Sequence, residues 1–381
     1  MNTAATRLRD PREGDSLDFA VLDVRLRATA DPEDLAYIRA FTDAYEPDER
    51  SNAARPHVEV SAVRAERPGG LVEADGRDVW VHRSKHPYWN VRGRRIAPAC
   101  VRWLNRPVVS VRDGERSGRV ITAPDAAAAM TGEAAWHVCR SLALYARDAR
   151  AGKLLHASAV ALGGRCLLFV GRVSAGKTTL MTEAVLRHGA VPVANDRVLL
   201  AADGSRVVSW PSYASFTEGT LLDYDPLARA AHDYEEGRFP YRTQTWGPTL
   251  TRRYGKDAKR VYPMTWFAEA TGTHYLRSAP LGAIVVTRLE PGLARDVLER
   301  TDLGDPGERE ALAALLDAEC FDGDEPSFCP WHELPLPSGG VTGGHAVEAL
   351  RARGVPVYRF AASTSRFRSR LEQLLAEVGA R

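Results

Sequence analysis

Apolar and polar positions alternate with a short period in the first third of the chain. Gly, Pro and Asp clusters separate the short alternating or β-branched runs, as is typical of strands joined by turns. We predict one helix near residues 32–45 and a β-rich N-terminal module over residues 1–128 that recognises a substrate or a partner. The runs that predict strands are 58–63 (VEVSAV), 78–82 (DVWVH) and 107–112 (PVVSVR).

The pattern changes after Pro124-Asp125, where the segment PDAAAAMTGEAAWHVCRSLALYARDAR favours one long helix. We expect this helix to run to Arg150 and to stop before Gly152. The domain boundary is expected just before or within the helix, so that residues 129–381 form a second domain. An amphipathic helix in the segment FRSRLEQLLAEVGAR is expected to pack at the end of this domain.

The pattern then predicts a hairpin, a loop, a helix and a strand. Residues 154–162 (LLHASAVAL) alternate as one strand, Gly163-Gly164 suits a tight turn, and residues 165–170 (RCLLFV) form a buried strand. After the loop, a helix is expected to end at Gly189. Residues 191–194 (VPVA) follow as a second core strand, with Asn195 and Asp196 at its carboxyl end.

The loop between this strand and this helix reads GRVSAGKT, a phosphate-binding pattern in the strand-to-helix context that it requires. Backbone N–H groups of such a loop converge on phosphate oxygens at a helix N-terminus. Lys177 is expected to reach the β- and γ-phosphates of ATP, and the Thr178 hydroxyl to bind Mg²⁺. The predicted nucleotide-binding residues are Gly171, Arg172, Val173, Ser174, Ala175, Gly176, Lys177, Thr178 and Thr179.

Asp196 follows on the very next strand, at the mouth of the predicted sheet. Two functional roles fit an acid there: holding Mg²⁺ together with Thr178, or accepting a proton from an attacking hydroxyl. A plain turn Asp is the alternative. Motor and switch NTPases usually place this acid after intervening elements, so the short spacing favours a kinase.

The segment LLHASAVALGGRCLLFVGRVSAGKTTLMTEAVLRHGAVPVANDRVLL resembles the HPr kinase/phosphorylase family, which is related in fold to phosphoenolpyruvate carboxykinase. The resemblance covers roughly residues 136–200 and implies an α/β P-loop kinase domain that uses ATP and Mg²⁺ and can form a homo-oligomer. It also implies catalytic roles for three residues: His156 near the γ-phosphate, Lys177 on the phosphates and Asp196 as general base.

The chain departs from the family pattern at two positions of this segment. Asn195 replaces the first acid of an acidic pair, and Ser174 replaces a glycine that many members have. The family's downstream signature for engaging HPr is not recognisable, so we expect the acceptor to be a hydroxyl of a peptide or a small metabolite. Asn195 also motivates a second hypothesis, a nucleotide-sensing regulatory protein without transfer activity.

Composition changes this picture little. A net charge of +2, 44% hydrophobic residues and 26% charged residues are ordinary for a soluble protein. No apolar run approaches the roughly 20 residues of a membrane span, and the first residues carry no stretch of the signal-peptide kind. We therefore expect a cytoplasmic protein without a membrane partner. Five scattered cysteines do not suggest a disulfide framework.

Four further groups of residues carry alternatives. Lys259 and Arg260 hold the transferred phosphoryl group or form a solvated charge cluster, and Glu218 is a second metal ligand or a surface turn acid. Residues 79–112 contain eight Lys/Arg, no acid, and aromatic residues including Tyr88, Trp89 and Trp103. This composition fits an acidic peptide or a nucleic acid held by charge and stacking, with nucleic acid the less favoured of the two. The alternative is a solvated sheet face whose aromatic residues belong to the core. A zinc site is the weakest of these hypotheses, because its spacing matches no compact finger; it would use Cys320, Cys329 and His332.

Overall fold

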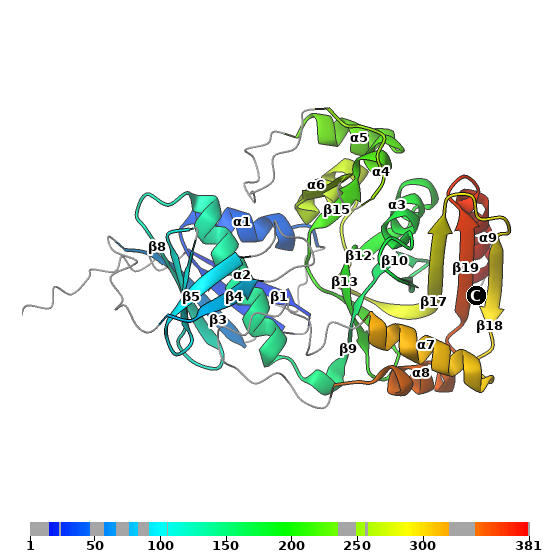
Figure 1. Ribbon diagram of the computed structural model, residues 1–381, viewed down its shortest axis with the longest axis horizontal. Coiled ribbons are helices and arrows are strands. Elements are labelled where there is room, and N and C mark those ends of the chain that lie inside the picture. Colours follow the sequence, from blue (N-terminus) through cyan, green and yellow to red (C-terminus); the bar gives the residue numbers. More distant parts are fainter. Residues whose placement is uncertain are drawn as a thin grey trace, which may run out of the picture.

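The computed structural model describes residues 15–22, 24–45, 57–65, 76–82, 91–104, 106–234, 249–255, 258–319 and 340–379. The fold is mixed α/β, with an N-terminal part built on one sheet beside a C-terminal part built on a second sheet (Figure 1). The predicted α/β class is therefore confirmed at this level. Among the described residues, no helix combines the length and the apolar character that a membrane span needs.

The N-terminal sheet has the strand order β1-β2-β3-β8-β7-β6-β5-β4. The strands predicted at 58–63, 78–82 and 107–112 are confirmed, and the predicted first helix is α1 (Pro32–Thr42). Pairing is antiparallel except at β2–β3 and β3–β8. The bounds are β1 (Ser16–Val21), β2 (Val24–Thr29), β3 (Val58–Arg64), β4 (Asp78–His82), β5 (Val91–Ala97), β6 (Cys100–Trp103), β7 (Val108–Arg112) and β8 (Ser117–Thr122).

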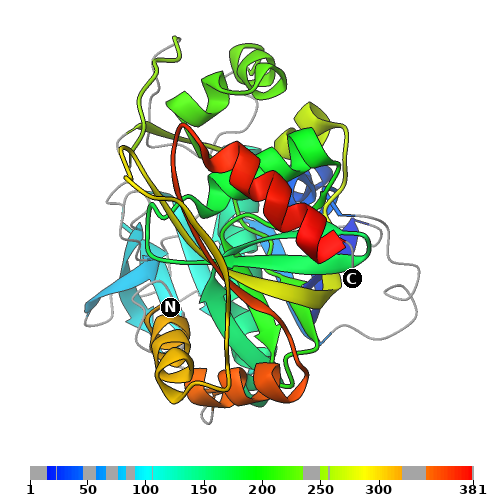
Figure 2. The same cartoon turned by 90° about the vertical axis from the view of Figure 1, so that its right-hand side faces the viewer.

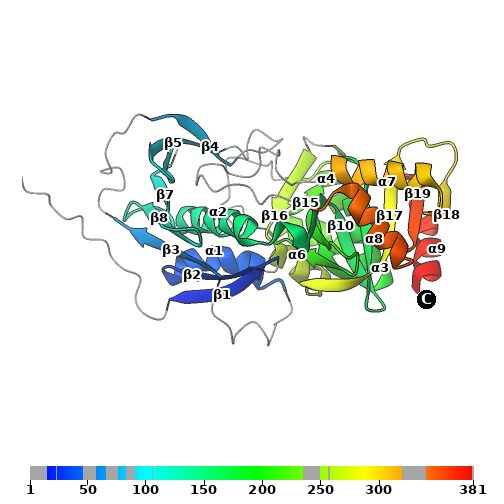
Figure 3. The ribbon, with the colours of Figure 1, turned by 90° about the horizontal axis from the view of Figure 1, so that it is seen from below.

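The long predicted helix is α2 (Ala128–Ala146), and it packs against α1, β3 and β8 of the N-terminal sheet (Figure 3). Its buried face includes Trp136, which stacks on Phe41 with a centroid separation of 4.8 Å. The predicted end of this helix at Arg150 is wrong. The backbone becomes extended at Arg147, and a short 3₁₀ turn, η3 (Ala149–Ala151), lies between the helix and Gly152.

The C-terminal sheet has a parallel centre, β11–β17–β19, flanked by antiparallel strands. Its main path runs β12-β10-β11-β17-β14-β13-β9, and β18 pairs with β19. The bounds are β9 (Gly152–His156), β10 (Ser158–Leu162), β11 (Arg165–Val170), β12 (Val191–Ala194), β13 (Arg197–Ala201), β14 (Arg206–Ser209), β17 (Ser278–Glu290), β18 (Val297–Thr301) and β19 (Val357–Ser363).

Helices cover both faces of this sheet. Along β11, Leu167 and Phe169 belong to the core that includes α3 (Lys177–His188) and α9 (Phe367–Gly379). The alternate positions Leu168 and Val170 belong to the core that includes α7 (Pro306–Ala318) and α8 (Gly343–Ala352). This alternation follows from the period of two along a strand. Figure 2 shows α9 across one face, with α7 and α8 lying away from it.

A small subdomain projects above the C-terminal sheet in Figure 1. Its two strands pair antiparallel, with Thr217 opposite Lys259 and Phe216 opposite Arg260. Aromatic rings, including the stacked pair Tyr262–Trp266 at 3.8 Å, hold the last helix of the subdomain to these strands. The elements are β15 (Ala214–Thr217), α4 (Glu218–Leu222), α5 (Asp225–His232), β16 (Lys259–Tyr262) and α6 (Met264–Thr271).

The predicted hairpin is confirmed, and Gly163 and Gly164 at its turn adopt positive φ angles of 58° and 79°. The single strand expected over residues 154–162 is instead two strands that meet at Ala157. The break arises because β9 pairs with β13, whereas β10 pairs with β11 and β12. His156 consequently ends one strand and does not lie in the middle of a longer one.

Candidate functional site

The phosphate-loop sequence lies where β11 ends, beside the parallel strand β17. Gly171 has φ +156°, and a Cβ there would lie 2.7 Å from the Thr287 carbonyl oxygen. Gly176 has φ +90°, and a Cβ there would lie 2.4 Å from Leu289. Ser174 also adopts a positive φ, 68°, which explains why glycine suits this position in other loops. The loop is thus shaped by its close approach to β17.

Lys177 is the first residue of α3 and is only 6% exposed. Its ammonium donates to the carbonyl oxygens of Gly171 and Arg172, the latter at 3.1 Å, so the charge lies inside the curve of the loop. A lysine held there, at the positive end of a helix, provides the cationic surroundings that phosphate oxygens require. Thr178, the next residue, is partly exposed and presents a hydroxyl at the same helix end.

Strand register brings His156 and Asp196 together. The β9–β13 ladder sets His156 opposite Arg197, the residue that follows Asp196. The backbone N–H of Ala157 donates to the Asp196 carbonyl at 3.1 Å. On the β10 side, the Ser158 hydroxyl donates to the Asn195 carbonyl at 2.6 Å. The segments 152–162 and 191–201 are therefore paired on both sides of the point where each of them changes strand.

His156 lies between two carboxylates. Its Nε2 is 3.3 Å from Asp196 Oδ1, and its Nδ1 is 3.2 Å from Glu319 Oε2. Burial alone would lower the pKa of His156, but the hydrogen bonds to both carboxylates outweigh burial and the nearby Lys177 charge and raise it. The His156 ring is therefore biased towards its charged form, with an N–H group for each carboxylate.

Asp196 is held from two sides but remains accessible. Its side chain is 38% exposed, with His156 on Oδ1 and Arg197 Nε 3.5 Å from Oδ2. Burial alone would raise the pKa of Asp196, but the hydrogen bond and charge of His156, together with the charges of Arg197 and Lys259, lower it well below its ordinary range. Asp196 is thus an ionised carboxylate that a bound molecule can reach.

Glu319 was not predicted by the sequence analysis. It follows α7 and lies 163 positions from His156 in the chain. No local motif marks it, because its partner comes from a different part of the fold. Its side chain is 11% exposed, and its backbone oxygen also accepts a hydrogen bond from the His156 N–H at 2.8 Å.

The residues at the loop offer oxygen donors suited to Mg²⁺. Besides the Thr178 hydroxyl and the Asp196 carboxylate, Asn195 Oδ1 is buried and has no hydrogen-bond partner among the described residues. A buried amide oxygen without a partner is costly, so a ligand to it is favoured. The described residues contain no group of three or more His, Cys, Asp and Glu suited to a metal. Mg²⁺ with ATP needs no such group, since phosphates and water complete its shell.

Glu218 takes neither of its two predicted roles. It is 5% exposed at the start of α4, and its Oε1 accepts from Arg260 Nε at 3.1 Å and from Arg260 Nη2 at 2.9 Å. Its Oε2 accepts from the Thr251 N–H at 3.2 Å and from Arg253 at 3.1 Å. A surface acid was wrong because the carboxylate is enclosed by the loop 249–255 and β16. The same contacts occupy the oxygens that a metal would need.

Arg260 and Lys259 are separated by this arrangement, since neighbouring residues on β16 face opposite ways. Arg260 is 5% exposed and pairs with Glu218, so it does not belong to a solvated cluster. Lys259 is half-buried, and its charge lowers the pKa of Asp196. Of the two predicted phosphate-binding cations, Lys259 is thus the one whose charge reaches Asp196.

The basic stretch 79–112 is described only in part, because residues 83–90 and 105 lie outside the described residues. Trp103 is 1% exposed and donates from Nε1 to the Ser110 hydroxyl at 2.9 Å, so it belongs to the core and cannot stack on a base.

The zinc hypothesis concerns Cys320, Cys329 and His332, which also lie outside the described residues. Cys100, Cys139 and Cys166 are buried free thiols.

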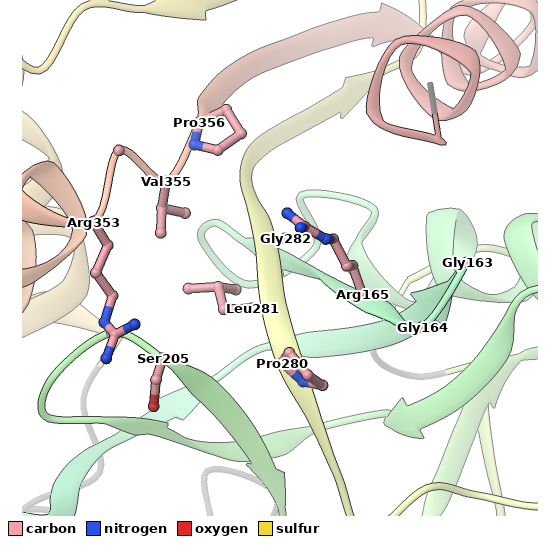
Figure 4. A pocket seen from close by; sticks show the side chains of 12 residues that line it. Gly163, Gly164, Arg165, Ser205, Pro280, Leu281, Gly282, Arg353, Val355 and Pro356 are labelled. Carbon is pink, nitrogen blue, oxygen red and sulfur yellow. The ribbon is translucent and has the colours of Figure 1, made fainter. Parts of the chain in front are cut away.

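A cavity of 510 Å³ lies at the opposite end of the central strands (Figure 4). Its lining includes Arg165 at the start of β11, Leu281 near the start of β17, and Val355 just before β19. The phosphate loop instead follows the carboxyl end of β11. The cavity is therefore separate from the site formed by the loop, His156 and Asp196.

No protein-family model matches the chain, and no curated protein matches it significantly.

Proposed function

We propose that the protein is an ATP-dependent kinase that transfers the γ-phosphoryl group to a hydroxyl of a peptide or small metabolite. The observation that carries the proposal is the contact between Asp196 and His156, 3.3 Å apart, within range of the Lys177 charge in the phosphate loop. A nucleotide-binding loop alone serves many functions. An accessible carboxylate fixed beside it serves the acceptor side of a transfer reaction.

In this proposal the loop residues and Lys177 hold the phosphates. Thr178 and Asp196 hold Mg²⁺, with the Asn195 amide oxygen as a further donor. When bound there, Mg²⁺ would supply positive charge against the phosphate groups. Lys259 supplies a second cation on the side of the acceptor, where its charge already acts on Asp196.

The lowered pKa of Asp196 bears on its role. A carboxylate with a low pKa is fully ionised at neutral pH but is a weak base. Phosphoryl transfer proceeds in most analyses through a loose transition state, in which the acceptor proton is lost late. Asp196 would therefore act mainly by orienting the acceptor hydroxyl and would take its proton as the new P–O bond forms.

Mass spectrometry of a peptide or metabolite pool incubated with protein, ATP and Mg²⁺ tests the proposal. We expect one component to gain the mass of a phosphate, and the gain to disappear with Lys177→Met. A gain of a nucleotidyl group would show that a different bond of ATP is broken. No ATP-dependent change in any hydroxyl-bearing component would contradict kinase activity.

Asn195 favours a second candidate, the nucleotide-sensing protein. An amide in place of a carboxylate removes a negative charge at the metal, which weakens Mg²⁺ binding without preventing nucleotide binding. In this case ATP would protect the chain from limited proteolysis, and no acceptor would release ADP. The two candidates are thus separated by measuring protection and ADP release on the same sample.

A further inference from the structure

The Glu319 carboxylate touches the one ring nitrogen of His156 that does not face Asp196. We propose that Glu319 is a positioning residue that fixes the orientation of the His156 ring against Asp196. The inference rests on the proposed kinase function for its effect on transfer, but not for its effect on the ring.

The geometry of an imidazole explains why the contact of Nδ1 with Glu319 affects the contact of Nε2 with Asp196. Rotation of the His156 ring by 180° about its Cβ–Cγ bond exchanges Nδ1 with a carbon and Nε2 with another carbon. In the rotated ring, a C–H group would face each carboxylate. The hydrogen bond from Nδ1 to Glu319 therefore selects the orientation in which Nε2 meets Asp196.

Glu319 is itself held in place along the main chain. The His156 N–H donates to the Glu319 carbonyl at 2.8 Å, so the backbone of Glu319 is bound to the last residue of β9. Lys153, on the same strand and 3% exposed, is 2.7 Å from Asp317 Oδ1 and donates to the Val341 carbonyl at 2.9 Å. The end of α7 is thus tied to β9, and the Glu319 side chain has little freedom to move away.

Among the described residues, charged groups from three separate elements act on His156. Asp196 follows β12, Glu319 follows α7, and Lys177 begins α3. In the proposed reaction, Lys177 belongs to the nucleotide side and Asp196 to the acceptor side, whereas the described contact of the Glu319 side chain is with His156. Its effect on the reaction would pass through His156, as expected of a residue that supports another.

The test compares Glu319→Ala and Glu319→Gln with a matched control, Asp317→Ala. Glutamine keeps an oxygen that accepts from Nδ1–H, and alanine does not. Asp317 lies at the same helix end and binds the same strand but does not contact His156. A loss shared by all three variants would indicate a structural role for the helix end.

Two measurements are made on the full chain. Two-bond ¹H–¹⁵N spectra at one fixed pH, with His156 assigned by His156→Asn, report the hydrogen bonding of both ring nitrogens. Mg·ATP turnover with the acceptor found by mass spectrometry, or with water if none is found, reports the reaction. We expect Glu319→Ala to alter the His156 signals and lower kcat by about 10- to 100-fold, with KM for ATP within about twofold.

Glu319→Gln should restore most of kcat and the wild-type ring signals. Asp317→Ala removes a tie between α7 and β9 but keeps the Glu319 carboxylate, so it should change both less than Glu319→Ala does. Unchanged His156 signals in Glu319→Ala would overturn the inference. If the wild-type protein transfers no phosphate and hydrolyses no ATP, the proposed function fails, and the spectra still decide whether Glu319 orients the ring.

Discussion

Asp196 and Glu218 are two acids that the sequence placed among the metal-site candidates, and the fold treats them differently. Asp196 is 38% exposed, and its ion-pair contacts with His156 and Arg197 are 3.3 and 3.5 Å long. The Glu218 side chain is 7% exposed, and Arg260 binds it through two N–H groups. A carboxylate with its oxygens filled by buried donors stabilises a fold, whereas one with exposed oxygen remains available to a ligand.

The largest expected effect comes from Asp196→Asn. The amide keeps the shape but loses the charge that orients the acceptor, so we expect phosphoryl transfer to fall by about 10²- to 10⁴-fold. Because the side chain is partly exposed, the loss of folding free energy should be smaller than the loss caused by breaking a fully buried ion pair. ATP affinity, measured by calorimetry without Mg²⁺, should stay within a few-fold. Unchanged turnover would remove Asp196 from the site.

Arg260→Met should give the opposite pattern. It leaves the Glu218 charge buried without its main partner, which costs about 3 to 5 kcal/mol of folding free energy. Thermal and urea unfolding of the variant measure this loss. Transfer per folded molecule should be close to wild type, since Arg260 does not contact Asp196 or the loop. A variant with normal unfolding but lost transfer would place Arg260 in the site instead.

The Glu218 ion pair also predicts a pH dependence of stability. Burial alone would raise the pKa of Glu218, but the hydrogen bonds from Thr251, Arg260 and Arg253 lower it from 4.5 to about 2. A lowered carboxyl pKa stabilises the folded state above the unfolded value and loses this contribution as the pH falls towards the folded value. Unfolding followed between about pH 5 and pH 2 should therefore show a loss of about 3 kcal/mol from this group.

The comparison for this pH series is Glu218→Gln. The variant is less stable at pH 7, but its stability should fall less between pH 5 and pH 2, because no carboxyl group titrates at this position. Parallel pH curves for the two proteins would mean that Glu218 is not held by the ion pair described here.

The contrast between the two acids also marks how far sequence reasoning reached. The phosphate loop, the Gly163-Gly164 turn and the strands beside them were predictable because each depends on residues close together in the chain. Even there, the break at Ala157 was missed, since it depends on which strands pair on either side.

The family resemblance implied roles for both His156 and Asp196, and the strand register explains physically how the two come together. The surroundings of Asp196 and Glu218 depend on contacts between distant positions. His156, which contacts Asp196, is 163 positions from its second partner Glu319, and Glu218 is 42 positions from Arg260. Composition and periodicity carry no signal for such pairs. Burial decided the outcome for Glu218, and an isolated turn sequence such as FTEGT gives no sign of it. The burial of Trp103 is equally invisible in a basic stretch that also contains aromatic residues.

Substitution of Lys259 should give the smallest of these effects. Lys259 adjoins Arg260 on β16, but its charge acts on Asp196, whereas Arg260 pairs with Glu218. Lys259→Met removes a cation whose charge lowers the pKa of Asp196. We expect kcat to fall roughly tenfold, which is a modest loss for one half-buried charge that faces a developing anion. ATP affinity should stay within about twofold, and Lys259→Arg should recover most of the lost kcat. Arg252→Met, which removes an exposed cation paired with Asp223 in the same subdomain, is the control and should be neutral. An unchanged kcat in Lys259→Met would return Lys259 to the solvated charges, whereas a tenfold loss of ATP affinity alone would assign it to the nucleotide.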